Sequence, residues 1–390
     1  MVDLSLCCGC TACYNVCPRK CISMRADREG FLYPIKDEAK CVNCNLCEKV
    51  CPVLNLTDKF EGKPFTWGGY AEDEDVRQAS SSGGIFTLLA ESVIERGGVV
   101  FGAALSQDCN SVHHIAVENK EELACLRGSK YVQSELGNCF SVVKDYLKTG
   151  RNVLFSGTFC QIDGLMLYLR KDYENLLTIE LICHGVPAPN LYKKYLADMK
   201  HKLNGMIKRI VFRDEIGGDN LIMRIETNST IYRADMNEDP YYSLFMSNNC
   251  LRPSCYNCQS KGRKRRADIT LADFWGSEKV VPELIDGKGL SLVIVHNKKG
   301  LRAFDVISDR INGQEVAFSD AIKGNQAFYK SYDMPKSRDK FWNDFNRMNI
   351  YQLQYKYCGG RKKKIKKILE KMRLLSLIKK AKRFVSIDKS

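Results

Sequence analysis

Between residues 70 and 320, short apolar runs alternate with segments whose apolar residues recur every three or four positions. Apolar runs bounded by turn residues are typical of buried β-strands, and the periodic segments are typical of helices that cover a sheet. Strands are expected at 99–105, 152–157, 176–183 and 291–297, and helices at 85–96, 140–148 and 161–173. This alternation predicts an α/β or α+β domain with a mixed sheet.

The alternation ends on both sides of this body. Residues 52–68 contain Pro and Gly but no cysteine, which is typical of a linker, so a new domain is expected near Gly69. A chain of 390 residues is long enough for two or three domains. We therefore expect an α+β protein in three parts: a cysteine-rich domain at 1–60, the mixed-sheet domain at 69–345, and a basic tail at 358–390.

Composition is that of a globular protein with a sizeable core, since 44% of the residues are hydrophobic and 27% are charged. The formal net charge of +14 is uneven, because residues 358–390 hold thirteen Lys and Arg against two acidic residues and so carry +11. The rest of the chain carries only +3, which gives no reason to expect a nucleic-acid binder.

The tail also has a helical pattern. Its apolar residues recur at helical spacing, with lysines between them, at positions 365, 368, 369, 372, 375 and 378. A basic amphipathic helix suits an anionic membrane surface or an acidic partner; a solvated helix without a binding role is the alternative. The first twenty residues have neither a basic segment nor an apolar core, so we expect no signal peptide, and we expect no membrane span because no run of 18 apolar residues occurs. We expect a cytoplasmic protein that the tail can bring to the inner face of the membrane.

Cysteine is the residue type that points to chemistry. Ten of the nineteen cysteines fall within the first 51 residues, and disulfides are disfavoured in a reducing cytosol, so metal or redox chemistry is expected. Two segments share the spacing C-x2-C-x2-C-x3-C-P, which is the run of bacterial two-cluster ferredoxins, where the fourth cysteine ligates the other cluster. The spacing assigns one 4Fe–4S cluster to Cys7, Cys10, Cys13 and Cys51, and the other to Cys41, Cys44, Cys47 and Cys17.

The alternative for these two segments is a pair of structural zinc ribbons. Zinc ribbons favour two C-x-x-C knuckles separated by a longer loop, whereas each segment here packs four cysteines into eleven residues. Cys8 and Cys21 do not fit the spacing, and we interpret them as buried thiols beside the clusters. Residues 30–40 are expected to form a short hairpin that covers the clusters with apolar side chains.

Two segments of the larger body have the composition of phosphate-binding loops. Ser80-Ser81-Ser82-Gly83-Gly84 directly precedes an expected helix, where small residues and the helix N-terminus can hold a pyrophosphate. A plain serine N-cap is the alternative. Residues 127–134, which include Gly128, Ser129, Lys130 and Tyr131, offer cations and an aromatic ring, although an ordinary surface turn has the same composition.

A second group of cysteines lies in this body, at positions 160, 183, 250, 255 and 258. Cys160 and Cys183 each follow an expected strand, and the ends of adjacent strands lie close together in a sheet. Four thiolates from three segments would form a third 4Fe–4S cluster; a zinc site and scattered core cysteines are the alternatives.

Few other residues stand out as candidates for proton transfer. His184, next to Cys183, is either a proton donor or a hydrogen-bond donor to a cluster sulfur, and Lys130 and Tyr131 are further candidates. Asp268 and Asp273 are expected to cap the chain or to pair with Arg265 and Arg266.

Taken in order, the segments GFLYPIKDEAKCVNC, SSSGGIFTLLAESVIERGGVVFGA, RGSKYVQS, FSGTFCQIDGL, LICHGVPAP, VFRD, CLRPSCYNC and RRADITLADFWG resemble the coenzyme F420 hydrogenase/dehydrogenase beta subunit family, in its bacterial form with a ferredoxin domain in front. The resemblance runs from Cys7 to Asn297. It implies a non-covalent FAD bound by the serine-glycine loop and the GSKY segment, beside a 4Fe–4S cluster. Its cluster ligands fall on Cys160, Cys183, Cys255 and Cys258, with Cys250 as an extra cysteine.

One position departs from the family pattern. The family reads GTPCQ where this chain has Phe159. Because proline fixes φ and restricts the residue before it, we expect the loop around Cys160 to be looser here.

Electron counting then gives a mechanism. Clusters transfer single electrons, and a flavin exchanges either single electrons or pairs, so it belongs between the clusters and an organic substrate. We expect an oxidoreductase that relays electrons between a ferredoxin or another redox protein and a small molecule. An electron-transfer subunit for a separate catalytic partner and a redox sensor are the alternatives.

Overall fold

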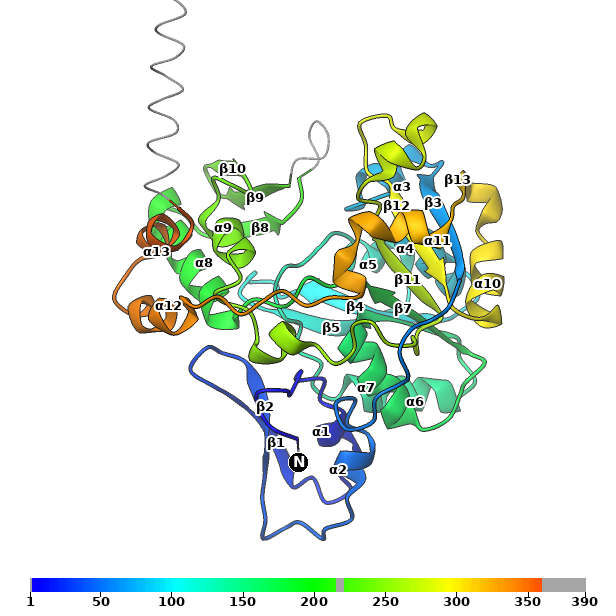
Figure 1. The fold of residues 1–390 in the computed structure, drawn as a ribbon, viewed down its shortest axis with the longest axis horizontal. Coiled ribbons are helices and arrows are strands. Elements are labelled where there is room, and N and C mark those ends of the chain that lie inside the picture. The colour runs from blue at the N-terminus through cyan, green and yellow to red at the C-terminus, as the bar shows by residue number, and fades with distance from the viewer. Residues whose placement is uncertain (1, 215–220, 360–390) are drawn as a thin grey trace, which may run out of the picture.

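The centre of the protein, in a computed structural model that describes residues 2–214 and 221–359, is a mixed sheet of eight strands (Figure 1). The strand order is β13-β3-β12-β11-β7-β6-β4-β5, in which β4, β6, β7 and β11 are parallel and the other pairings are antiparallel. The strands are β3 (Phe65–Ala71), β4 (Val99–Leu105), β5 (Val112–Val117), β6 (Val153–Thr158), β7 (Leu176–Leu181), β11 (Ile269–Asp273), β12 (Ser291–Val295) and β13 (Ile311–Glu315).

Helices cover both faces of this sheet, so its central strands are largely apolar, with Ser156 on β6 and Thr178 and Glu180 on β7 as buried polar exceptions. On one face α4 (Ile85–Ile94) and α10 (Lys298–Asp305) pack over β4, β6, β7 and β11, together with the short α5 (Lys120–Leu123). On the other face lie α6 (Cys139–Lys148) and α7 (Phe159–Leu169). All four strands and all three helices expected from the sequence are present in this layered arrangement, and the prediction of a mixed sheet is confirmed.

Strand β3 begins at Phe65, inside the segment 52–68 that we expected to be a linker. The segment looks unlike a strand because Gly68 and Gly69 follow one another. A Cβ on Gly68 would lie 2.3 Å from the Phe274 ring, and one on Gly69 would lie 2.2 Å from the carbonyl oxygen of Asn312. The two glycines are therefore required by packing against neighbouring strands rather than by a flexible connection.

A second layer stands beside the main sheet (Figure 1). It contains an antiparallel sheet in the order β10-β9-β8 and a large aromatic core. Its elements are β8 (Ile207–Val211), β9 (Ile222–Thr227), β10 (Ile231–Asp235), α8 (Pro189–Leu203), α9 (Pro240–Met246), α12 (Arg338–Phe345) and α13 (Ile350–Tyr357). Two further short helices, α3 (Glu74–Gln78) and α11 (Phe318–Ala321), flank the main sheet.

The amino-terminal domain packs under α6 and α7 (Figure 1). It consists of the hairpin β1 (Ile22–Ala26) and β2 (Leu32–Lys36) and the short helices α1 (Ala12–Val16) and α2 (Leu46–Lys49). The expected hairpin at 30–40 is wrong in its extent, because these residues supply only the second strand. The first strand, ISMRA, alternates apolar and polar residues, but of its five residues only Ile22 is buried.

The two cysteine runs have the same backbone conformation. Gly9 and Thr11 have φ of 72° and 61°, and the equivalent Asn43 and Asn45 have φ of 52° and 55°. Left-handed residues are rare outside glycine, and Asn tolerates this region better than most residues. The repeat in sequence is therefore a repeat in structure.

Among the described residues no helix is long and apolar enough to span a membrane. The basic tail predicted at 358–390 lies outside the described residues from position 360 onward, so its helical pattern stays a prediction.

A buried ion pair joins the amino-terminal domain to α12. The Arg338 guanidinium forms a two-pronged contact with Glu29, with Nη1 2.9 Å from Oε1, and Nη2 also donates to the carbonyl oxygen of Leu251 at 3.1 Å. Both side chains are buried. Removal of one partner would leave the other without its counter-charge in the interior.

We expect Glu29→Gln to lower the free energy of unfolding by about 3–5 kcal/mol, because it leaves the Arg338 charge buried and unpaired. The double variant Glu29→Gln/Arg338→Gln removes both charges and should recover part of this loss. Urea unfolding followed by circular dichroism measures both effects. A single variant as stable as the double variant would contradict the assigned pairing.

Candidate functional site

A cavity of about 360 Å³ opens at the carboxyl ends of the parallel strands. Strands β6, β7 and β11 contribute their last residues to its wall, and the amino-terminal domain and the second layer close it from the sides. In open α/β sheets this edge is the usual place for a ligand. Its volume is within the range of known ligand sites.

The serine-glycine loop forms one wall of this cavity. Ser81, Ser82 and Gly84 line it together with the first turn of α4, whereas Gly83 does not. A Cβ on Gly83 would lie 2.5 Å from the carbonyl oxygen of Gly69, so this glycine serves packing against β3. The Ser82 hydroxyl donates to the carbonyl oxygen of Leu290 at 2.7 Å, which fixes the loop to the start of β12.

Residues 128–131 form the adjacent wall, and a hydrogen bond joins the two loops. The Ser129 amide donates to the Ser81 hydroxyl oxygen at 2.6 Å, and Gly128 has φ of 79° beside it. The Arg127 side chain lines the same cavity, and its buried Nε has no hydrogen-bond partner among the described residues. A small-residue cradle with an unused cationic donor fits an anionic ligand such as a pyrophosphate.

Lys130 presents a second cation to the cavity. Its Nζ donates to the carbonyl oxygens of Cys125 and Arg127, each at 2.8 Å. Burial lowers the pKa of Lys130 to about 7. The adjacent Tyr131 also lines the cavity, but its ring packs among Phe212, Tyr242 and Phe245, with centroid distances of 5.6–6.0 Å.

The inner cysteines line the same cavity. Cys160 follows β6 and Cys183 follows β7, and these strands are parallel neighbours with Thr158 opposite Leu181. The expectation that two strand ends bring these cysteines close is thus confirmed. Cys255 and Cys258 line the same end. Cys250 lies apart from them, fully buried, with its thiol against the carbonyl oxygen of Leu244 at 3.6 Å.

Cys8 was missed as a site residue. It lines the cavity with the four inner cysteines, and its hydrogen bond to Cys160 raises the pKa of that thiol well above its ordinary value. The sequence held one signal, since the second cysteine run has Val42 at the equivalent position. Cys21 also has a thiol neighbour, because its Sγ lies 3.3 Å from Sγ of Cys17.

Phe159 does not leave a loose loop in front of Cys160. It is the first residue of α7, which begins with a capping box between Thr158 and Gln161. Its ring is buried, with the guanidinium of Arg265 4.0 Å from the ring centre. The expectation of a looser loop is wrong, because packing and capping hold the position that a proline ring would otherwise restrict.

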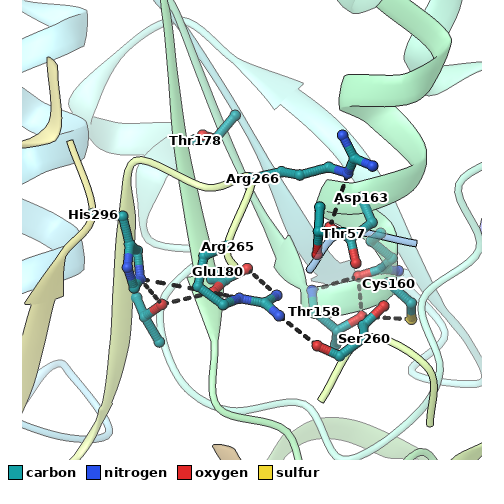
Figure 2. Close-up of polar contacts among 12 residues, drawn as sticks. Thr57, Thr158, Cys160, Asp163, Thr178, Glu180, Ser260, Arg265, Arg266 and His296 are labelled. Carbon is teal, nitrogen blue, oxygen red and sulfur yellow. Dashed lines mark hydrogen bonds and ion pairs between the residues drawn. The ribbon is translucent and has the colours of Figure 1, made fainter. Parts of the chain in front are cut away.

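A buried polar network lies beside Cys160 (Figure 2). Arg265 binds both carboxylate oxygens of Glu180 on β7 at 2.6 Å and donates to the carbonyl oxygen of Ser260 at 2.5 Å. It therefore fixes the segment after Cys258 against the strand that leads to Cys183. Partners of this kind orient metal ligands and tune the metal.

The network extends to His296, and its neighbours determine which ring nitrogen carries the proton. The Thr270 hydroxyl contacts Oε1 of Glu180 and Nε2 of His296, each at 2.6 Å. Because Glu180 can only accept when ionised, Thr270 donates to it, and His296 must carry its proton on Nε2. Burial lowers the pKa of His296 to about 4, so the ring is neutral at pH 7.

His184 is oriented by protein groups rather than by sulfur. Its Nε2 lies 2.6 Å from Oδ1 of Asn248, and its ring stacks on Tyr332 at 4.0 Å. Burial lowers the pKa of His184. These contacts to Asn248 and Tyr332 hold the His184 ring in place, and neither of them is to a cysteine sulfur.

The predicted partners of the two aspartates are wrong. Asp268 accepts from the Thr178 amide and hydroxyl at 2.7 and 2.8 Å, and Asp273 binds Arg213 at 2.6 Å. Arg265 pairs with Glu180 instead, and Arg266 lies 3.7 Å from Asp163.

The amino-terminal cysteines fall into two groups in space. A cavity of about 30 Å³ is lined by Cys7, Cys8, Cys10, Cys13, Cys47 and Cys51. The last cysteine of the second run therefore lies with the first three of the first run, but so does Cys47, which the spacing assigns to the other cluster. Cys21 lies in a separate group, because its hydrogen bond to Cys17, burial and the nearby Cys41 raise its pKa to about 11, and Cys44 is exposed. Among the described residues, no three Cys, His, Asp or Glu side chains are grouped as around a single metal ion.

The charges at the inner cysteines fit an anionic, thiolate-ligated group. Burial raises the pKa of Cys183 to about 12, and the nearby charge of Lys261 opposes that shift. Lys261 is itself buried, and its Nζ donates to the carbonyl oxygens of His184 and Lys330 at 3.2 and 3.1 Å. The Lys261 charge acts on two of the four thiols, Cys183 and Cys258, and a cation there favours such a group.

Comparison with protein families gives three matches. Residues 66–140 match the profile for the N-terminal part of the coenzyme F420 hydrogenase/dehydrogenase beta subunit, and residues 150–318 match the profile for the C-terminal part of the same protein. Residues 6–55 match the 4Fe-4S dicluster domain. The first two profiles together match more than half of the chain.

Among solved structures, a chain of the xenon-derivatised F420-reducing [NiFe] hydrogenase complex from Methanosarcina barkeri is similar, with 16% sequence identity and a TM-score of 0.47. The alignment covers 80% of this chain and 95% of that chain. No curated protein matches this chain.

The start of α7 yields a stability prediction. We expect Phe159→Ala to lower the free energy of unfolding by about 3–5 kcal/mol, since it opens a cavity in the core. Phe159→Pro should cost less, because proline is favoured at the first position of a helix. Thermal unfolding followed by circular dichroism compares the two. A proline variant that is less stable than the alanine variant would contradict this account of the helix start.

Proposed function

The chain belongs to the coenzyme F420 hydrogenase/dehydrogenase beta subunit family and carries a 4Fe–4S dicluster domain, and from this premise we propose that it is an iron–sulfur flavoprotein oxidoreductase. It would hold two clusters in the amino-terminal domain, a third at Cys160, Cys183, Cys255 and Cys258, and FAD between the third cluster and the serine-glycine loop. Its partners would be a ferredoxin or another redox protein and a small-molecule substrate.

One observation carries this proposal: a single cavity is lined both by an anion cradle and by the four inner thiols. When bound there, a flavin supplies the exchange between single electrons and electron pairs. The chain's own residues would do the rest. Ser81, Gly84 and Gly128 would hold the pyrophosphate by their backbone and hydroxyl groups, and Arg127 would neutralise its charge.

The loop from Cys7 to Cys10 supports an electron path between the domains. Cys7 and Cys10 line the small amino-terminal cavity, while Cys8 between them lines the large one as well. A cluster ligand and a residue of the inner site are therefore neighbours along the chain. This arrangement favours electron transfer between the first amino-terminal cluster and the inner cluster.

The word "subunit" in the family description favours a second function, in which the chain transfers electrons to a separate catalytic partner. Turnover by the purified chain alone would support the first function, and turnover only after addition of a partner would support the second. Because the family is described by coenzyme F420, a deazaflavin is the first substrate to test.

The proposal predicts the cofactor content of anaerobically purified protein. We expect about twelve irons, about twelve acid-labile sulfides and about one FAD per chain, as three 4Fe–4S clusters and one flavin require. Cys183→Ser should lose about four irons and keep about eight. Cys250→Ser is the matched control and should keep all of them, since its thiol lies outside the cavity. About eight irons without flavin in the unaltered protein would contradict both the third cluster and the flavin site.

Lys130 predicts that FAD binding depends on pH. A lysine ammonium has three donors, two of which the carbonyl oxygens of Cys125 and Arg127 occupy, so the third exists only in the protonated form. The pKa of about 7 places the loss of that donor, and of the charge, near neutral pH. The dissociation constant for FAD should rise about tenfold between about pH 6 and about pH 8, the effect of one charge-assisted hydrogen bond.

Lys130→Arg is the control for this effect, because arginine stays charged throughout this range. Fluorescence titration of the flavin-free protein with FAD measures the dissociation constant at each pH. A pH dependence that persists in Lys130→Arg would assign the effect to another group.

A further inference from the structure

Arg252 is a buried cation that has no carboxylate partner among the described residues. Its side chain is 1% exposed, and among the described residues no carboxylate forms an ion pair with it. The other three buried arginines in this part of the chain each bind a carboxylate: Arg77 binds Asp286, Arg265 binds Glu180 and Arg338 binds Glu29. A charge in the interior that lacks a counter-charge is strongly destabilising, so Arg252 requires an anion that the amino acids alone do not supply.

The contacts of Arg252 show where that anion belongs. Its Nε donates to the carbonyl oxygen of Cys7 at 2.7 Å, Nη2 to that of Leu32 at 2.8 Å, and Nη1 to Oε1 of Gln133 at 3.0 Å. These acceptors are neutral. Nη2 also lies 4.0 Å from Sγ of Cys7. The Tyr33 ring lies 4.3 Å from the guanidinium, but burial raises the pKa of Tyr33 to about 12, so it is neutral as well.

Cys7 is therefore the group in contact with Arg252 that becomes anionic when it ligates a metal cluster. We propose that Arg252 is the counter-charge of the amino-terminal cluster that Cys7 ligates, and that its positive charge sets the reduction potential of that cluster. The inference rests on the proposed ligand set of Cys7, Cys10, Cys13 and Cys51. A cluster held by four thiolates is anionic and gains one more negative charge on reduction, so a fixed cation beside it stabilises the reduced form.

The fold places this charge at the border between the two cysteine groups. Arg252 lies three residues before Cys255 in the sequence and lines the large cavity, while its guanidinium reaches the first cysteine run. Gly9 permits the approach, since a Cβ at this position would lie 2.7 Å from Nη1 of Arg252. The cluster nearest the inner site thereby acquires a charge that the second amino-terminal cluster does not share. A higher potential would draw electrons from the outer cluster toward the inner site.

Anaerobic redox titrations monitored by electron paramagnetic resonance test this inference without an activity assay. Arg252→Gln keeps hydrogen-bonding capacity but removes the charge, so the potential of one cluster should become more negative. We expect the ratio of reduced to oxidised cluster at fixed potential to fall about tenfold, which corresponds to about 59 mV for one electron. Arg252→Lys keeps the charge and should retain most of the original potential. Gly9→Ala, which displaces the guanidinium, should shift the same cluster in the same direction.

The matched control is Glu29→Gln/Arg338→Gln, which removes a buried arginine at the same domain border together with its own counter-charge. Its cluster potentials should stay those of the unaltered protein. Unchanged potentials in Arg252→Gln, or an equal shift in Arg252→Lys, would overturn the proposed role and leave Arg252 a structural residue. Iron and sulfide analysis of each variant separates this outcome from failure of the proposed ligand set, which would appear as missing clusters in the unaltered protein.

Discussion

The functional site depends on the close approach of residues 7–10 to the mixed-sheet domain. Residues Cys7 to Cys10 lie between the Arg252 guanidinium and helix α7, and a glycine makes room on each side. A Cβ on Gly9 would lie 2.7 Å from Arg252, and a Cβ on Gly164 would lie 2.9 Å from Sγ of Cys10. Glycine within a helix costs about 0.5–1 kcal/mol relative to alanine. That cost is offset here because the helix can rest directly against a cysteine.

This contact gives the two cysteine groups a common border. Because α7 begins with Phe159 and Cys160, the helix that receives Cys10 also presents the first inner cysteine. The Arg265–Glu180 pair fixes the strand that leads to Cys183, and the same arginine holds the chain after Cys258. Buried charge pairs contribute little net stability, since desolvation opposes their attraction, but they specify one arrangement of the groups around them. The thiols of the inner site therefore occupy positions set by the surrounding protein.

Positively charged side chains gather around the cavity. Arg127, Lys130, Arg252 and Lys261 line one cavity, and Arg127 pairs with Glu91 at 3.5 Å. Described partners of Lys130, Arg252 and Lys261 are chiefly carbonyl oxygens, which satisfy hydrogen bonds without cancelling charge. Such a cavity favours anionic ligands at both ends. Its shape comes from the sheet, whereas its electrostatic character comes from the loops at the strand ends.

The sequence by itself determined the features that local spacing controls. Cysteines three residues apart, the left-handed positions between them and the largely apolar runs of β4, β6, β7 and β12 all depend on neighbours along the chain. From the sequence, only the resemblance to a known family indicated that three segments form one site: the serine-glycine loop, residues 128–131 and the inner cysteines. The fold brings these segments to one cavity. Tertiary structure alone decided the strand at Phe65–Ala71, the place of Cys8 and the burial of Arg252. Each depends on contacts between segments far apart in the chain. A glycine pair and an arginine have no distinctive pattern of their own, and Cys8, although the second run has Val42 in its place, does not show from the sequence which cavity it lines.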